Sequence, residues 1–219
     1  MSRAAAWAVV LGASLAALGW WLPWVIPERG TAALVLLGLD LGEFWKFTAE
    51  WRGGLFALER LFFFLPPPLA AMTLTLWVAG ARGWGRWLLL PLLLFLSVVI
   101  LPAFEFVREV LKENPLVYED GNLAREFSFQ FYLALGSLLV VGLLPLWHRA
   151  GERLRSGFVA LLAGAGALLP AWALWRTWLV LQGFYGDGAL LGPGIFLTSG
   201  GFALALAGAS YHLKQKGKT

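Results

Sequence analysis

Residues 156–175 read SGFVALLAGAGALLPAWALW, twenty consecutive uncharged residues between Arg155 and Arg176. An α-helix rises about 1.5 Å per residue, so this stretch covers about 30 Å, the thickness of the hydrocarbon core of a bilayer. Pro170 lies inside the stretch and predicts a kink, because proline removes one backbone hydrogen bond of the helix. The stretch therefore predicts a helix that crosses a membrane.

Five further uncharged intervals, each bounded by charged residues or histidines, are 18 to 24 residues long. Each meets the length that a membrane-spanning helix needs. The expected spans are 4–26, 61–81, 87–104, 127–147, 156–180 and 190–211. The sequence thus predicts an all-α fold, a polytopic transmembrane helix bundle of about six spans, with residues 1–219 forming a single transmembrane domain.

The composition agrees with a membrane protein. Of the 219 residues, 59% are hydrophobic and 14% are charged, whereas a soluble domain carries about 25% charged residues. The chain contains 13 tryptophans, and tryptophan is enriched where a membrane meets water. The lipid bilayer is therefore the first expected partner of this chain.

The first span has an alternative interpretation as a signal peptide. Arg3 precedes an apolar run with small residues at Ala16 and Ala17, which is the arrangement of such peptides. The run continues through Trp20-Trp21-Leu22-Pro23-Trp24, longer and more aromatic than a signal peptide needs. This continuation favours a membrane span.

The distribution of lysine and arginine predicts the orientation, because these residues favour the cytoplasmic side. With the N-terminus inside, the inner segments carry a net charge of +8 and the outer segments −4. The inner basic residues are Arg3, Arg82, Arg86, Arg149, Arg153, Arg155, Lys214, Lys216 and Lys218. We therefore expect a multi-pass protein of the bacterial cytoplasmic (inner) membrane with both termini in the cytoplasm.

The first outer loop contains signals for a short helix. Asp40-Leu-Gly-Glu43 fits a capping box, in which Asp40 accepts from a backbone N–H and Glu43 reaches back. An amphipathic helix over about 41–52 would follow, lying on the outer membrane surface or over the bundle. Two interpretations stay open for it: a lid that packs on the bundle, or a gate over a substrate path.

Three prolines, Pro66 to Pro68, predict where the second span begins. Proline is tolerated in the first turn of a helix and breaks its interior. We therefore expect the helix to start near Pro66 and residues 55–65 to form a separate piece. Irregular backbone at membrane depth must be covered by protein or face water, which makes this corner a candidate cavity wall.

Ionisable residues near membrane depth supply the candidate functional site, because they are expensive in lipid. Arg176 is expected either to snorkel to the outer interface or to pair with Glu105 or Asp187, or with an anionic headgroup or substrate. The predicted outer-side functional cluster is Asp40, Glu43, Lys46, Glu105 and Arg176.

Catalytic and cofactor signatures are absent from the sequence. The chain has no cysteine, no phosphate-binding loop and no HExxH motif. The two histidines, His148 and His212, lie at the inner ends of spans and are interpreted as interfacial residues, with haem or metal ligation as the alternative. No catalytic residue, metal or cofactor is assigned, and no long basic block suggests nucleic-acid binding.

Small residues at a spacing of four predict close helix packing. The expected contact positions are Gly12 and Ala16, Ala160 and Gly164, and Gly201, Ala205 and Ala209.

Residues 38–47, GLDLGEFWKF, are followed by Glu59-Arg60-Leu-Phe-Phe-Phe-Leu-Pro-Pro67. This segment resembles a family of uncharacterised bacterial multi-span membrane proteins, in which GLDL-x-E-F-x-K-F precedes an aromatic-Leu-Pro-Pro helix start. The resemblance covers about 30 of the 219 residues. It implies that the first outer loop is the signature of the family and that such proteins accompany transport ATPases.

Three classes of function stay open. We expect a non-catalytic membrane subunit, transport-related or otherwise, that acts with other membrane subunits or a cytoplasmic ATPase. One alternative is a membrane-embedded enzyme acting on lipid-linked substrates, with Asp40, Glu43 or Glu105 working beside Arg176. The other alternative is a stand-alone carrier or channel for small solutes.

Overall fold

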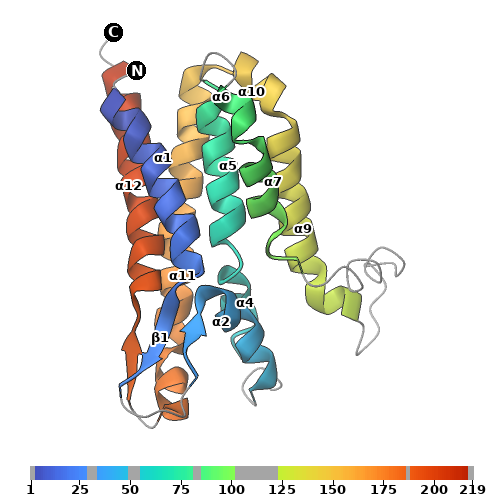
Figure 1. Cartoon of the computed structure of the whole chain (residues 1–219), viewed down its shortest axis with the longest axis vertical. Coiled ribbons are helices and arrows are strands. Elements are labelled where there is room, and N and C mark those ends of the chain that lie inside the picture. The colour runs from blue at the N-terminus through green and yellow to red at the C-terminus, as the bar shows by residue number, and fades with distance from the viewer. Residues whose placement is uncertain are drawn as a thin grey trace.

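The computed structural model of the protein describes residues 3–28, 34–48, 55–80, 85–101, 123–185 and 188–216. It is an elongated, mostly helical bundle (Figure 1). The helices are α1 (Arg3–Trp20), α2 (Gly38–Phe44), the 3-10 helix η1 (Trp45–Phe47), α4 (Ala57–Phe62), α5 (Pro66–Val78), α6 (Gly85–Leu88), α7 (Leu90–Val98), α9 (Leu123–Gly142), α10 (Leu144–Arg149), α11 (Glu152–Phe184) and α12 (Pro193–Lys216). The strands are β1 (Pro23–Pro27), β2 (Leu36–Leu37) and β3 (Ala189–Leu191). Both chain termini lie at one end, here called the terminal end, and the strands lie at the other, the sheet end (Figure 1).

Each predicted span contains a helix, but several spans are divided between two elements. The third is divided into α6 and α7, and the fourth into α9 and α10. Pro91 lies in the first turn of α7, and Pro145 lies in the first turn of α10. There the missing backbone N–H of proline has no partner within the helix to lose. Pro170 lies inside α11, which continues through it as one helix.

The small sheet was not predicted by the sequence analysis. Residues 23–27, expected at the end of the first span, form β1, which pairs antiparallel with β2 on one side and β3 on the other. A short apolar run bounded by prolines is ambiguous between helix and strand in sequence. The fold is therefore mostly helical, as expected, with a small sheet added at this end.

Tyr185, which follows α11, holds the same end together. Its hydroxyl donates a hydrogen bond to the carbonyl of Leu34, next to β2. Partial burial raises the pKa of this phenol above its ordinary value, because burial disfavours the phenolate. The hydroxyl therefore stays protonated and keeps donating at neutral pH.

The interface between α1 and α12 is built from small residues, as predicted. A Cβ added at Gly201 would lie 2.5 Å from the carbonyl oxygen of Gly12. Ala16 and Ala205 line the same contact and are fully buried. The prediction for Gly164 was wrong: its Cβ position has no atom within 4 Å among the described residues.

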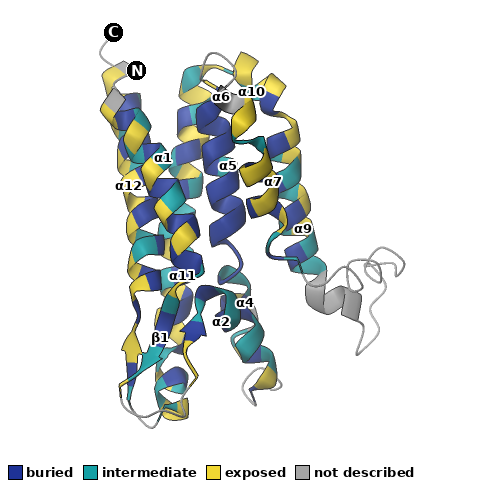
Figure 2. Ribbon diagram, viewed as in Figure 1, coloured by how far each residue is buried: buried dark blue, intermediate teal, exposed yellow. Residues whose placement is uncertain are grey.

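Helix α5 is the centre of the bundle and begins at Pro66, as predicted, with α4 as a separate helix before it. Figure 2 shows α5 buried along nearly its whole length. It packs against α1, α7, α9 and α11. The buried hydroxyls of Ser97 in α7 and Ser137 in α9 are 2.8 Å apart and join these two neighbours.

Two helices in the described part of the chain, Glu152–Phe184 and Pro193–Gln215, are long and apolar enough to cross a membrane by length and composition. Only 33% and 44% of their apolar windows are buried inside the protein. On α11 the exposed side includes Leu161, Leu168, Trp175 and Leu179, the last of them 80% exposed. Their spacing places them on one face of the helix, which is therefore an apolar stripe that the protein does not cover.

Candidate functional site

The helix predicted over about 41–52 begins earlier, at Gly38, and continues as η1 to Phe47. Residues 49–54 lie outside the described part of the chain. Leu41 and Trp45 are fully buried, so the apolar side of this segment packs into the bundle. This burial favours the lid interpretation over the gate.

The predicted capping box was displaced by three residues. The N-cap is Leu37, and its backbone N–H donates to the Asp40 carboxylate at 3.1 Å. Asp40 is thus the third residue of the helix, where a carboxylate also complements the helix dipole. Its function is local stabilisation of α2.

Glu43 is the centre of a polar cluster at the sheet end. Its carboxylate lies 2.6 Å from the Lys46 amine and accepts a hydrogen bond from the Gln130 amide at 3.1 Å. The guanidinium of Arg60 lies 3.9 Å away. Glu43 therefore joins η1, α4 and α9 through contacts that the sequence pattern alone did not reveal.

Arg60 was not among the predicted site residues, although its side chain is only 1% exposed. Its Nε donates a 2.7 Å hydrogen bond to the carbonyl oxygen of Gly42 in α2. A buried charge needs such a partner. The only sequence signal for Arg60 was its position directly before the aromatic-Leu-Pro-Pro run.

Arg176 pairs with Glu59 of α4, Nε to Oε1 at 3.4 Å. The expected partners Glu105 and Asp187 lie outside the described residues. The Arg176 side chain is 52% exposed, and its guanidinium carbon lies 5.9 Å from the centre of the Trp172 ring. This exposed position favours the snorkelling interpretation.

Helix α4 therefore connects the residues of the predicted cluster. Its Arg60 bonds to α2, and its Glu59 pairs with Arg176 of α11. Asp40, Glu43 and Lys46 lie on the neighbouring segment α2–η1. In the part of the chain that the structure describes, each of these side chains has a structural partner. The arrangement joins the α2–η1 segment to α4 and α9 of the bundle.

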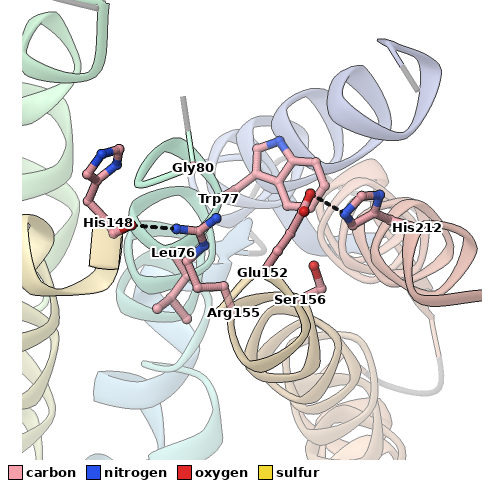
Figure 3. A pocket seen from close by; sticks show the side chains of 8 residues that line it. All are labelled: Leu76, Trp77, Gly80, His148, Glu152, Arg155, Ser156 and His212. Carbon is pink, nitrogen blue, oxygen red and sulfur yellow. Dashed lines mark hydrogen bonds and ion pairs between the residues drawn. The ribbon is translucent and has the colours of Figure 1, made fainter. Parts of the chain in front are cut away.

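A cavity of about 610 Å³ lies at the opposite, terminal end of the bundle (Figure 3). It lies among the end of α5, the end of α10, the beginning of α11 and the last turns of α12. Its lining residues are Leu76, Trp77, Gly80, His148, Glu152, Arg155, Ser156 and His212. The sequence analysis did not predict it, because these helix ends are far apart in the chain.

His212 and Glu152 form a pair across this cavity, with Nε2 and Oε1 2.6 Å apart. His212 is almost fully buried and packs edge-on against the Trp77 ring. Since a carboxylate only accepts, the imidazole donates from Nε2. The pair joins the first turn of α11 to the end of α12.

His148 and Arg155 occupy the other side of the cavity. The Nδ1 of His148 donates to the carbonyl oxygen of Ala79 at 2.8 Å. Arg155 donates from Nη1 to the carbonyl oxygens of Trp147 at 3.0 Å and His148 at 3.3 Å. These are carbonyls at the C-terminus of α10, where a cation is favoured.

His148 and His212 lie on opposite sides of the cavity. Among the described residues, no group of three His, Cys, Asp or Glu side chains is placed to hold a metal ion. Each histidine already uses one ring nitrogen in a hydrogen bond within the protein. Among the lining residues that the structure describes, Arg155 is the one permanent cation and Glu152 the one acid, and the cavity is a polar chamber.

Comparisons with protein-family models, with curated proteins and with solved structures found no match for this chain. The resemblance of residues 38–47 to a family of bacterial multi-span membrane proteins stays a prediction from the residues themselves. Function is therefore argued from the geometry alone.

Proposed function

We propose that the chain is an integral membrane protein with six spanning helices and that it serves as a non-catalytic subunit of a membrane assembly. The observation that carries the proposal is the uncovered apolar stripe on α11, where Leu168 and Leu179 are 70% and 80% exposed. In water such a stripe would be an aggregation hazard. In a bilayer it is the surface that lipid covers.

The positions of the charges on α11 support a transmembrane placement. Arg155 and Arg176 are 21 positions apart, with twenty uncharged residues between them, which corresponds to about 32 Å of helix. That length brackets a hydrocarbon core of about 30 Å. Arg155 then lies at one interface and Arg176 at the other, each close to water.

The contacts at the sheet end support a subunit function over an enzyme at the outer carboxylates. Asp40 stabilises the first turn of α2, and Glu43 joins Lys46 and Gln130. Glu59 is buried beside Arg176. Carboxylates held in this way stabilise the lid, which is a structural function.

Purification of the tagged protein from its native membranes in a mild detergent tests the subunit proposal. We expect a second membrane chain or a cytoplasmic ATPase to co-elute in stoichiometric amount and to be identified by mass spectrometry. The control is the same purification from membranes without the tag. A single species free of partners, with flux in proteoliposomes holding this chain alone, would instead establish a stand-alone carrier.

A further inference from the structure

The cavity at the terminal end is unlike the rest of the bundle, which is packed with apolar side chains. Six of its eight lining residues carry a nitrogen or oxygen in the side chain: Trp77, His148, Glu152, Arg155, Ser156 and His212. Its volume of about 610 Å³ lies within the range of about 300–1,000 Å³ typical of small-molecule sites. A polar chamber of this size suits a polar ligand larger than water.

Arg155 supplies a fixed cation with donors to spare. A guanidinium has five N–H groups, and in the described part of the chain Arg155 uses only Nη1, toward the carbonyls of Trp147 and His148. Three N–H groups, on Nε and Nη2, remain. Figure 3 shows the guanidinium between His148 and Glu152, among the residues that line the chamber. This planar arrangement matches the oxygens of a phosphate.

His212 has an unpaired ring nitrogen beside the chamber. Its side chain is 3% exposed, and its Nδ1 is buried without a hydrogen-bond partner within the described residues. Because Nε2 donates to Glu152, the neutral ring presents Nδ1 as an acceptor. Because this nitrogen is closed to solvent, the donors available to an anion in the chamber are those of Arg155.

Glu152, the one acid among the described lining residues, is directed away from Arg155. Figure 3 shows the Glu152 carboxylate pointing to His212, from which it is 2.6 Å away. The acid therefore orients His212 and leaves the Arg155 side of the chamber positive.

The surroundings of the chamber attract anions. Arg149, Arg153 and Lys214 are exposed at the same end of the bundle, and they raise the local concentration of anionic ligands. The N-terminus of α11, which carries Glu152 and Arg155, adds the positive end of its helix dipole. Charge, donors and volume all favour the same class of ligand.

We propose that this chamber binds a phosphate group, carried by a membrane phospholipid or by a soluble phosphate compound, with Arg155 as the main anion-binding residue. The proposal goes beyond the subunit function and does not depend on it. A partner that co-purifies and a ligand that binds here are separate observations, so either can fail alone.

Calorimetric titration of the full-length protein in detergent tests this assignment. Delipidated protein is titrated with inorganic phosphate and, separately, with a short-chain anionic phospholipid. We expect saturable binding of at least one probe and a loss of about tenfold or more in affinity for Arg155→Gln, because a charge-assisted, forked contact is removed. The matched control is Arg153→Gln, a cation two residues away that does not line the chamber.

A second variant leaves the charge in place. A Cβ at Gly80 would lie 3.0 Å from Nη2 of Arg155, so Gly80→Leu fills the chamber and should weaken binding while the protein elutes normally on size exclusion. Binding of phospholipid alone identifies a headgroup site, and binding of both probes identifies a general phosphate site. Absence of binding by either probe, or equal affinity in Arg155→Gln, Gly80→Leu and the wild type, would overturn the proposal.

Discussion

Replacing Gly201 by leucine will disrupt the bundle, and the same change one residue earlier, at Gly200, will not. A Cβ added at Gly201 would lie 2.5 Å from the carbonyl oxygen of Gly12 and 2.6 Å from the backbone nitrogen of Ala16. These are backbone atoms, which a side-chain rotation does not move away. Overpacking of a well-packed core lowers the free energy of unfolding by about 1–3 kcal/mol. Because the atoms in the way belong to the backbone, we expect Gly201→Leu to cost about 3 kcal/mol or more.

Gly200 is the matched control, because a Cβ there meets no atom within 4 Å among the described residues. Leucine is also a better helix former than glycine, by up to about 1 kcal/mol. The measurement is the thermal midpoint and the monodisperse fraction of each variant in detergent. Equal midpoints for Gly200→Leu and Gly201→Leu would show that α1 and α12 do not pack through this contact.

Arg60→Met will destabilise the protein far more than Arg176→Met, although both arginines lie at the sheet end and face carboxylates. Arg60 is 1% exposed and donates to the Gly42 carbonyl at 2.7 Å. Methionine keeps the apolar packing and leaves that buried carbonyl without its donor, at a cost of about 2 kcal/mol. Arg176 is 52% exposed, and an exposed ion pair contributes about 0–1 kcal/mol.

The thermal midpoints of the two methionine variants, measured in the same detergent, test this predicted difference in stability. The expected order is wild type, then Arg176→Met close below it, then Arg60→Met. If Arg176→Met were the less stable variant, α4 would be held mainly by the Glu59 contact to α11, and the polar cluster around Glu43 would not fasten the lid.

The features that the sequence predicted well are those with a local physical cause. A helix that crosses a bilayer requires a minimum length of uncharged residues, so the interval 156–175 predicted α11. Proline tolerates only the first turn of a helix, so Pro66 marked the start of α5. Small residues permit close approach, so Gly12 and Gly201 indicated a tight helix contact.

The features that the sequence did not predict depend on contacts between distant segments. Strand β1 pairs with β3, more than 150 residues later, and nothing in residues 23–27 alone chooses strand over helix. Arg176 pairs with Glu59, a carboxylate that the sequence analysis did not consider as its partner. The terminal cavity needs four helix ends to meet, so His148 and His212 looked ordinary until the fold placed them.

The most direct test of a membrane-spanning bundle with both termini on one side is labelling of single cysteines by a membrane-impermeant maleimide. The chain has no cysteine, so Leu34→Cys, Arg149→Cys and Leu168→Cys each carry one unique thiol. All three positions are exposed in the structure, at the sheet end, at the terminal end and on the apolar stripe of α11.

In intact cells, the account predicts labelling of Leu34→Cys alone. Arg149→Cys should react only in inside-out vesicles, and Leu168→Cys only after the membrane is dissolved and the protein unfolded, because lipid covers it. Rapid labelling of Leu168→Cys without detergent, or labelling of Leu34→Cys and Arg149→Cys from the same side, would contradict the transmembrane arrangement.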